Sequence, residues 1–430
     1  MNYLNTIDFA KQLDATDPLK KYRDRFLIPK HDGKDVLYFC GNSLGLQPKT
    51  VKEYINIELD DWAKYGVEGH FQARNPWFSY HEMFLQPVAK LVGALPTEVA
   101  LMNSLTTNLH LLFVSFYRPT AKRFKIICED DAFPSDHYAL ASQIKFHGYN
   151  PDEALIKLKP RDGEYCLRTE DIIKEIYKHG DELAVVLLGG VNYYTGQAFE
   201  IEPITFATHL VGAIAGFDLA HAAGNIKLSL HNWKVDFACW CTYKYLNSGP
   251  GGVAGIFVHE KFANDASLPR FAGWWGNDPA TRFQMSKEFI PATGASGWQL
   301  SNAPILAMAA HKASLDIFNE VTMDPISYKS KRLTGYLEFI VEEINKKHPA
   351  EEKLITIITP KEDAQRGCQL SLIIYRNAKE IHQQLTANGV IADWREPNVI
   401  RLAPVPLYNT YEDVFAFGEI LSGLITPINS

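Results

Sequence analysis

Two short apolar runs that end in polar side chains carry the residues of this sequence best suited to chemistry. The first run ends at Asp218 and is followed by His221, and the second ends just before Lys244. Apolar runs of this kind are typical of buried strands whose carboxyl ends open on one crevice of an α/β sheet. The first run therefore brings a carboxylate and an imidazole to the crevice, and the second brings an amine.

A lysine amine beside a carboxylate suits an aldehyde cofactor held as a Schiff base, and pyridoxal 5'-phosphate (PLP) is the obvious candidate. PLP draws in electrons while its ring nitrogen is protonated. A partly buried aspartate about 4 Å away stabilises that form by about 4 kcal/mol at an effective dielectric near 20. Taken singly, Asp218 could be a helix cap and Lys244 a solvated strand-end residue. The glycine-rich residues 248–252 that follow allow close backbone approach, which favours a ligand.

Composition sets the class of protein. The chain has 430 residues, enough for two or three domains, and is 46% apolar and 22% charged, as is usual for a soluble globular protein. A formal charge of -7 argues against nucleic acid or an acidic membrane as the main partner. The N-terminus lacks the apolar core of a signal peptide and no segment approaches a transmembrane span, so we expect a cytoplasmic protein.

Cysteine usage supports the same interpretation. The six cysteines are scattered along the chain, which predicts reduced thiols rather than a disulfide framework. Cys239 and Cys241 form a close pair, but a lone C-x-C lacks the second half of a zinc site. We therefore predict that this pair packs in the core and that the protein has no metal site.

Strand and helix patterns alternate through the first two thirds of the chain. Continuous apolar strands are predicted at residues 124–128, 183–188, 211–217, 237–241 and 253–258, separated by helical stretches such as 169–178. This alternation is typical of a mostly parallel sheet with both faces covered. After Ala303 the pattern changes to a smaller α+β region, with a helix around 333–344, strands at 370–375, 390–392 and 399–403, and further helices at 378–388 and after Thr410.

Three further segments carry candidate ligand-binding residues. Polar residues 103–108 precede the apolar run 109–116, where they would cap a helix or bind phosphate at its N-terminus. Arg401 stands inside an apolar strand and needs an acidic partner, either a substrate carboxylate or an internal salt bridge. Trp274 and Trp275, between glycines, are expected to form flat walls for a ligand or a subunit interface rather than to pack in the core.

Several long motifs together resemble the kynureninase family. They read FPSD at 133–136, YTGQ at 194–197, FDLAH at 217–221, DFACWCTYKYLN at 236–247 and RLAPVPLYN at 401–409. The resemblance covers about residues 38–408. It implies an α/β fold: a large PLP-binding domain of fold-type I with a mostly parallel central sheet, and a smaller C-terminal α+β domain. The expected boundaries are residues 1–65 for an N-terminal segment at the small domain and active-site entrance, 66–310 for the large domain and 311–430 for the C-terminal domain.

The resemblance also implies the roles of individual residues. Lys244 would form the Schiff base, with Tyr194 or Tyr243 as the acid of the later steps. The expected cofactor-binding residues are Leu105, Thr106, Phe133, Pro134, Ser135, Asp136, Gly189, Asp218, His221, Tyr243, Lys244, Trp274 and Asn302. The expected substrate-binding residues are Arg401 for the carboxylate and Ser43, His70, Trp275 and Asn302 for the aryl group. Trp274 and Asn302 would reach in from the partner subunit of a homodimer.

The implied activity is hydrolysis of a carbon–carbon bond. Members of this family cleave L-kynurenine or 3-hydroxy-L-kynurenine between Cβ and Cγ, giving anthranilate or 3-hydroxyanthranilate and L-alanine, in tryptophan catabolism and NAD precursor supply. The alternatives are another fold-type I PLP enzyme, either an aminotransferase or a desulfurase, and a catalytically silent PLP-fold protein. Nucleotide motifs such as G-x-x-x-x-G-K-[ST] do not occur in the sequence.

Overall fold

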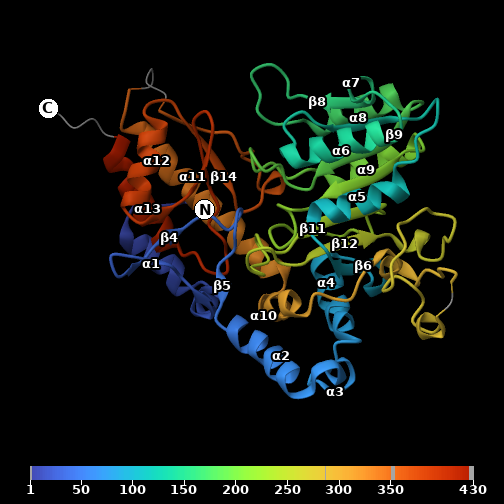
Figure 1. Ribbon diagram of the computed structural model, residues 1–430. Coiled ribbons are helices and arrows are strands. Elements are labelled where there is room, and N and C mark those ends of the chain that lie inside the picture. Colours follow the sequence, from blue (N-terminus) through green and yellow to red (C-terminus); the bar gives the residue numbers. More distant parts are fainter. Residues whose placement is uncertain (1, 286, 350–353, 426–430) are drawn as a thin grey trace.

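The computed structural model describes residues 2–285, 287–349 and 354–425. The α-helices are α1 (Ile7–Ala15), α2 (Val51–Tyr65), α3 (Gly69–Gln72), α4 (Leu85–Val92), α5 (Leu105–Phe116), α6 (Pro134–Phe146), α7 (Pro151–Ala154), α8 (Thr169–His179), α9 (Ile201–Leu210), α10 (Ile305–Val321), α11 (Met323–Lys346), α12 (Ala378–Ala387) and α13 (Tyr411–Ile425). Figure 1 shows how they are arranged around the two larger sheets.

The strands are short, from two to seven residues. They are β1 (Phe26–Leu27), β2 (Lys30–His31), β3 (Lys34–Asp35), β4 (Leu37–Tyr38), β5 (Gln47–Pro48), β6 (Val99–Met102), β7 (Lys125–Glu129), β8 (Leu155–Leu158), β9 (Leu183–Gly189), β10 (Ile214–Asp218), β11 (Phe237–Cys241), β12 (Ala254–Val258), β13 (Ile355–Ile357), β14 (Leu370–Ile374), β15 (Val390–Ile391), β16 (Asp393–Arg395) and β17 (Val399–Leu402). The strand pairs β1-β5, β15-β4 and β2-β3 form further, small sheets.

The larger sheet confirms the predicted α/β class. Its strand order is β6-β12-β11-β10-β9-β7-β8, and β12 alone runs antiparallel to its neighbours. The strand predicted at 211–217 begins later, at Ile214, because Gly212 turns the chain with a φ of 72°. Two strands were not predicted, β6 and β8, and they lie at the two edges of the sheet.

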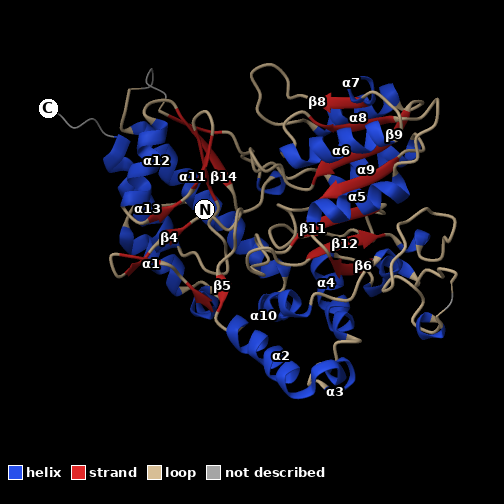
Figure 2. Ribbon diagram, viewed as in Figure 1, coloured by secondary structure: helices blue, strands red, loops and turns tan. Residues whose placement is uncertain are grey.

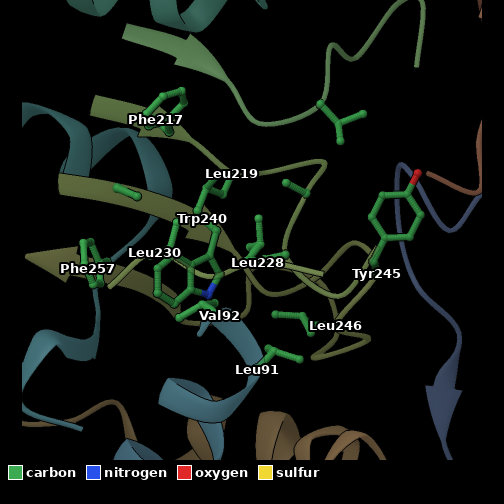
Figure 3. Close-up of a cluster of buried hydrophobic side chains, with 14 of the residues drawn as sticks. Leu91, Val92, Phe217, Leu219, Leu228, Leu230, Trp240, Tyr245, Leu246 and Phe257 are labelled. Carbon is green, nitrogen blue, oxygen red and sulfur yellow. The ribbon is translucent and has the colours of Figure 1, made fainter. Parts of the chain in front are cut away.

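Alternating side chains give this sheet two packed faces. Leu187 and Cys239 point to one face, where they pack with residues of α5 and α6, while Leu188 and Trp240 point to the other, beside α8 and α9. Strands buried on both faces read as continuous apolar runs, which explains the pattern in the sequence. In Figure 3, Trp240 lies at the centre of its cluster, between the strands and Val92 at the end of α4.

The smaller sheet is antiparallel, in the order β13-β14-β17-β16, and packs with α11, α12 and α13. Figure 2 shows these strands beside the helices on the opposite side of the molecule from the larger sheet. Ala10, Leu13 and Phe39 from the N-terminal part of the chain belong to this second core. The domain boundaries at residues 65 and 310 stay predictions, and α10 runs through residue 310.

No helix among the described residues has both the length and the apolar character needed to cross a membrane.

Candidate active site

A cavity of about 230 Å³ lies at the carboxyl ends of the parallel strands. Loops after β7, β9, β10 and β11 and the start of α5 form it, as expected for an open α/β sheet. It is lined by Leu105, Thr106, Glu129, Ala132, Phe133, Ser135, Asp136, Gly189, Val191, Asn192, Tyr193, Asp218, Ala220, His221, Tyr243 and Lys244. The tertiary structure thus brings most of the predicted cofactor-binding residues into one place.

The amine at the centre of the cavity has a defined partner. Lys244 Nζ lies 3.0 Å from His221 Nε2. Burial lowers the pKa of His221 well below its usual value, and the positive charges of Lys244, Arg401 and Arg395 lower it further. A neutral imidazole accepts a hydrogen bond from the amine, while His221 Nδ1 is buried without a hydrogen-bond partner. The arrangement holds the lysine in the cavity without adding a second charge to it.

Two buried carboxyl groups face this amine. Burial raises the pKa of Asp218 above its usual value, although its Oδ1 accepts a 2.7 Å hydrogen bond from the amide of Ala220. Burial, followed by the negative charges of Asp218 and Glu129, raises the pKa of Asp136 well above its usual value. The pair therefore retains a proton, and it suits a cationic ligand atom such as a pyridinium nitrogen.

The other end of the cavity suits an anion. Leu105 and Thr106 lie in the first turn of α5, and Ser135 lies in the first turn of α6. Free amide groups and the helix dipole make such ends favourable for phosphate. Tyr243 lines the cavity beside them. Pro134, also predicted to bind cofactor, begins α6 but is exposed and does not line the cavity, so its role stays a prediction.

An aromatic wall faces the lysine. The ring centroid of Phe133 lies 6.0 Å from Lys244 Nζ, and the ring meets Tyr193 edge-on at 5.2 Å. The side chain of Phe133 is 44% exposed, which leaves its face open for stacking on a planar ligand. Gly189 lies close to other chain segments, since a Cβ there would come within 3.3 Å of the Val191 carbonyl oxygen.

Sequence reasoning missed several cavity residues. Glu129 is buried, and its carboxylate accepts hydrogen bonds from the Gly189 amide at 2.7 Å and from the Asn192 side chain at 2.8 Å. Tyr193 follows Asn192 in the same loop and contacts Phe133. Both loops directly follow predicted strands, so the signal that selected Asp218 was also present here.

Other predicted site residues lie outside this cavity. They are Ser43, His70, Tyr194, Trp274, Trp275 and Asn302. His70 packs edge-on against Trp77 at 5.5 Å, and Trp274 and Asn302 are exposed. The expectation that both tryptophans form open walls is wrong for Trp275, which is 2% exposed because Phe78 and Arg282 pack against it. Contacts of these residues with cofactor or substrate stay predictions.

Arg401 is buried beside the cavity and forms an internal salt bridge. Its Nη2 lies 2.8 Å from Asp393 Oδ1, and its Nη1 donates a 2.6 Å hydrogen bond to the carbonyl oxygen of Tyr193. Burial lowers the pKa of Arg401. The internal salt bridge, one of the two expected roles of Arg401, is thus observed. Its binding of a substrate carboxylate stays a prediction.

One group of potential metal ligands occurs elsewhere among the described residues, although the sequence analysis predicted no metal site. Glu98, His231 and His259 bring one ligand atom each to within 4.8 Å of one another. Glu98 Oε1 already accepts from His231 Nδ1 at 3.0 Å and from the Glu260 amide at 2.8 Å, and His259 Nδ1 accepts from the Lys261 amide. These hydrogen bonds give the cluster a structural role.

The cavity fits PLP in its donor set. Lys244 provides an amine for the aldehyde, the proton-sharing aspartates face a position for the ring nitrogen, and two helix starts provide amides for phosphate. His221 Nδ1 offers an unused donor for a polar substituent. Each of these features lies on a different loop, so only the folded chain assembles them.

Comparisons with known proteins agree with this geometry. A family model described as the kynureninase C-terminal domain matches residues 326–421. The chain is 55% identical to a kynureninase of Flavobacterium psychrophilum over 421 residues, 98% of each chain, and 54% identical to one of Myxococcus xanthus, covering 96% of each. It is 46% identical to a kynureninase of Nematostella vectensis, covering 98% of this chain and 94% of that one.

Solved structures show the same fold at much lower identity. A cysteine desulfurase of Thermococcus onnurineus superimposes with a TM-score of 0.74 at 16% identity, covering 96% of this chain and 98% of that one. A cystine C–S lyase superimposes with a TM-score of 0.74 at 15% identity, covering 90% and 97%. This confirms the predicted PLP fold-type I class. Given its near full-length identity to curated relatives, the chain belongs to the kynureninase family of PLP-dependent hydrolases that act on carbon–carbon bonds.

Proposed function

We propose that this protein hydrolyses the Cβ–Cγ bond of L-kynurenine, 3-hydroxy-L-kynurenine or both, releasing anthranilate or 3-hydroxyanthranilate and L-alanine. The observation that carries the proposal is a relative named kynureninase, 55% identical over 98% of the chain, together with Lys244 and Asp218 in one cavity. Bound there, PLP would supply an aldehyde for covalent attachment and an electron sink for the substrate.

Four cavity residues would assist the cofactor. Lys244 would hold the cofactor and move the proton at the substrate α-carbon, since its amine is the base at the centre of the cavity. His221 would orient this amine through the 3.0 Å contact between their nitrogen atoms. Asp218, with Asp136, would keep the ring nitrogen protonated.

Tyr243 is the better candidate for the acid of the later steps. It lines the cavity, and burial raises its pKa above the usual value, so the hydroxyl keeps the proton that an acid must donate. Tyr194 is outside the cavity, and its backbone carbonyl accepts a 2.6 Å hydrogen bond from Ser371.

We also propose a homodimer that acts in the cytoplasm. Trp274 and Phe283 are 41% and 61% exposed and meet edge-on at 5.8 Å, which makes an aromatic surface suited to a second subunit. Trp274 and Asn302 would then complete the neighbouring site, where Arg401 would bind the substrate carboxylate and Ser43, His70, Trp275 and Asn302 would surround the aryl group. The six cysteines are free thiols, in keeping with a reducing compartment.

The direct test is product analysis with the PLP-loaded protein. Incubation with L-kynurenine should produce fluorescent anthranilate and an equal amount of L-alanine. An aminotransferase would instead consume the amino group and release no alanine, and a desulfurase would release sulfide from cysteine. A desulfurase also needs a reactive cysteine over the cofactor, and no cysteine lines the cavity formed by the described residues.

Lys244→Ala tests the same proposal at the level of the residue. The variant should lose the visible absorbance of the lysine-bound cofactor, and turnover should fall by about 10³-fold or more. Lys157→Ala is a suitable control because Lys157 is exposed on β8, away from the cavity. Turnover of Lys244→Ala at the wild-type rate would contradict the assignment, and loss of turnover in the control would show that the assay reports on folding.

A further inference from the structure

Three charged residues cluster on one hairpin beside the cavity. Asp393 on β16 is paired directly with Arg401 on β17. Arg395 lies two residues after Asp393 in the same strand, so both side chains point to the same face of the sheet. The register therefore places one carboxylate between two guanidinium groups.

This cluster carries more positive than negative charge. Asp393 Oδ1 lies 2.8 Å from Arg401 Nη2 and 2.9 Å from Arg395 Nε, so one carboxylate serves two arginines. The side chain of Arg401 is 1% exposed and that of Arg395 is 35% exposed. One positive charge is left without a partner inside the trio, on the side where Arg395 is accessible.

Tyr193 connects the cluster to the cavity. Tyr193 lines the cavity, and the guanidinium carbons of Arg395 and Arg401 each lie 5.8 Å from its ring centroid. The positive charges of both arginines also contribute, after burial and Lys244, to the lowered pKa of His221, which contacts the lysine amine. The unbalanced charge is thus next to the cavity and separated from it by one aromatic side chain.

The hydrogen bonds of Arg401 limit what it can bind alone. Its Nε donates to Asp393 at 3.1 Å, its Nη2 lies near the same carboxylate, and its Nη1 donates to the Tyr193 carbonyl. Arg401 therefore already uses Nε and Nη2 in a bidentate contact with Asp393. Arg395 makes one hydrogen bond to Asp393, at 3.3 Å from Nη2 to Oδ2.

We propose that Arg395 binds the α-carboxylate of the amino-acid substrate together with Arg401, and that Asp393 is a positioning residue that holds the two guanidinium groups side by side. Arg401 supplies a fixed N–H at the back of the site, and the more exposed Arg395 supplies the second cation. The inference rests on the proposed function only in requiring an amino-acid substrate.

The test measures the carboxylate contribution directly in the PLP-loaded protein. L-Alanine and ethylamine differ by one carboxylate, and binding of each is followed by the visible spectrum of the cofactor. In Arg395→Gln we expect the Kd of L-alanine to rise by about 10- to 100-fold, as for loss of a charge-assisted hydrogen bond, with the Kd of ethylamine unchanged. With L-kynurenine, KM should rise by a similar factor while kcat changes by less than about threefold.

Two further variants separate recognition from folding. Arg395→Lys keeps the charge and should recover part of the L-alanine affinity. Arg161→Gln removes a similarly exposed arginine from its 2.7 Å ion pair with Asp171, remote from the site, and should change neither Kd. Equal weakening of L-alanine and ethylamine in Arg395→Gln, or no change in either, would overturn the proposal.

The same measurements distinguish this proposal from the proposed function. Binding of L-alanine and ethylamine requires no turnover of L-kynurenine. If the wild-type protein releases no anthranilate, the proposed function fails, and the ratio of the two Kd values still decides the role of Arg395.

Discussion

The side chains of Lys244 and His221 form a hydrogen bond in the cavity, with 3.0 Å between Nζ and Nε2. Lys244 follows β11 and His221 follows β10, two adjacent parallel strands. The contact therefore depends on the sheet register, which aligns the two strand ends. Since His221 is neutral, it accepts from the amine and fixes its direction.

Replacing His221, the hydrogen-bond acceptor, should slow the reaction that Lys244 carries out while leaving Lys244 itself in place. In His221→Phe we expect kcat to fall by about 10- to 100-fold, because the amine loses a hydrogen bond to a charged or reacting group. Cofactor absorbance should remain, since Lys244 is intact. His137→Asn is the control: His137 contacts the Asp130 carbonyl at 3.0 Å outside the cavity. An unchanged kcat in His221→Phe would show that the contact has no catalytic importance.

The aspartate pair should make the cofactor-free protein less stable as pH rises. The unfolded Asp136 carboxyl titrates near about 3.9, and in the folded chain its pKa is raised, chiefly by burial. At a pH between the unfolded and the folded pKa of Asp136, the folded state binds more protons than the unfolded state. The free energy of unfolding therefore falls as pH rises.

Asp136→Asn removes this dependence while keeping the shape of the side chain. We expect the variant to gain about 1–2 kcal/mol over the wild type at pH 8 and less at pH 5, measured by urea denaturation of the cofactor-free protein. His221 also titrates on unfolding, because its pKa is lowered in the folded chain. Since it is present in both proteins, its contribution to the free energy of unfolding is removed when the two are compared at the same pH. A constant difference between the two proteins across this range would contradict the shared-proton interpretation.

Two phenylalanine substitutions should distinguish the candidate acids, Tyr243 and Tyr194. Tyr243→Phe should lower kcat by about 10²-fold or more, because a cavity-lining residue loses the hydroxyl that would donate the proton. Tyr194→Phe should change kcat by less than about threefold, since Tyr194 lies outside the cavity. Steady-state kinetics with L-kynurenine check both, and the opposite ranking would assign the acid to Tyr194.

Subunit mixing should reveal whether the site is shared between chains. Lys244→Ala and Trp274→Ala proteins are each expected to have low activity. When they are mixed under conditions that exchange subunits, we expect recovery of roughly a quarter of wild-type activity, because one site in each hybrid dimer is intact. Analytical ultracentrifugation would test whether the protein is a dimer. Absence of recovery despite proven exchange would place Trp274 outside the neighbouring site.

Gly45 should be intolerant of a side chain. Its amide donates a 2.8 Å hydrogen bond to the Tyr243 carbonyl, and a Cβ would collide with the Lys244 carbonyl and the Asn247 side chain. Gly45→Ala should cost about 1–3 kcal/mol of stability and lower activity by displacing the lysine loop. Gly423→Ala, in α13 with open space around it, is the control and should be neutral or slightly stabilising. Thermal unfolding and kcat measure both effects.

Local pattern was sufficient for the central strands of the larger sheet, which form continuous apolar runs. The strand predicted at 237–241 is β11 with the same bounds, and the helix predicted at 169–178 is α8, which ends one residue later. It was insufficient at the edges of the larger sheet, where β6 and β8 were not predicted. It was also insufficient for Trp275, whose burial depends on Phe78 and Arg282 from other segments.

By itself, the sequence determined the α/β class, the strand-end positions of Asp218 and Lys244, and through its motifs the family. Only the tertiary structure decided that burial beside Asp218 raises the pKa of Asp136, that burial lowers the pKa of His221, and that Asp393 forms ion pairs with both Arg395 and Arg401. Periodicity is a property of neighbouring residues, whereas these relationships depend on burial and on register between strands. Those quantities exist only when distant segments of the chain are packed together.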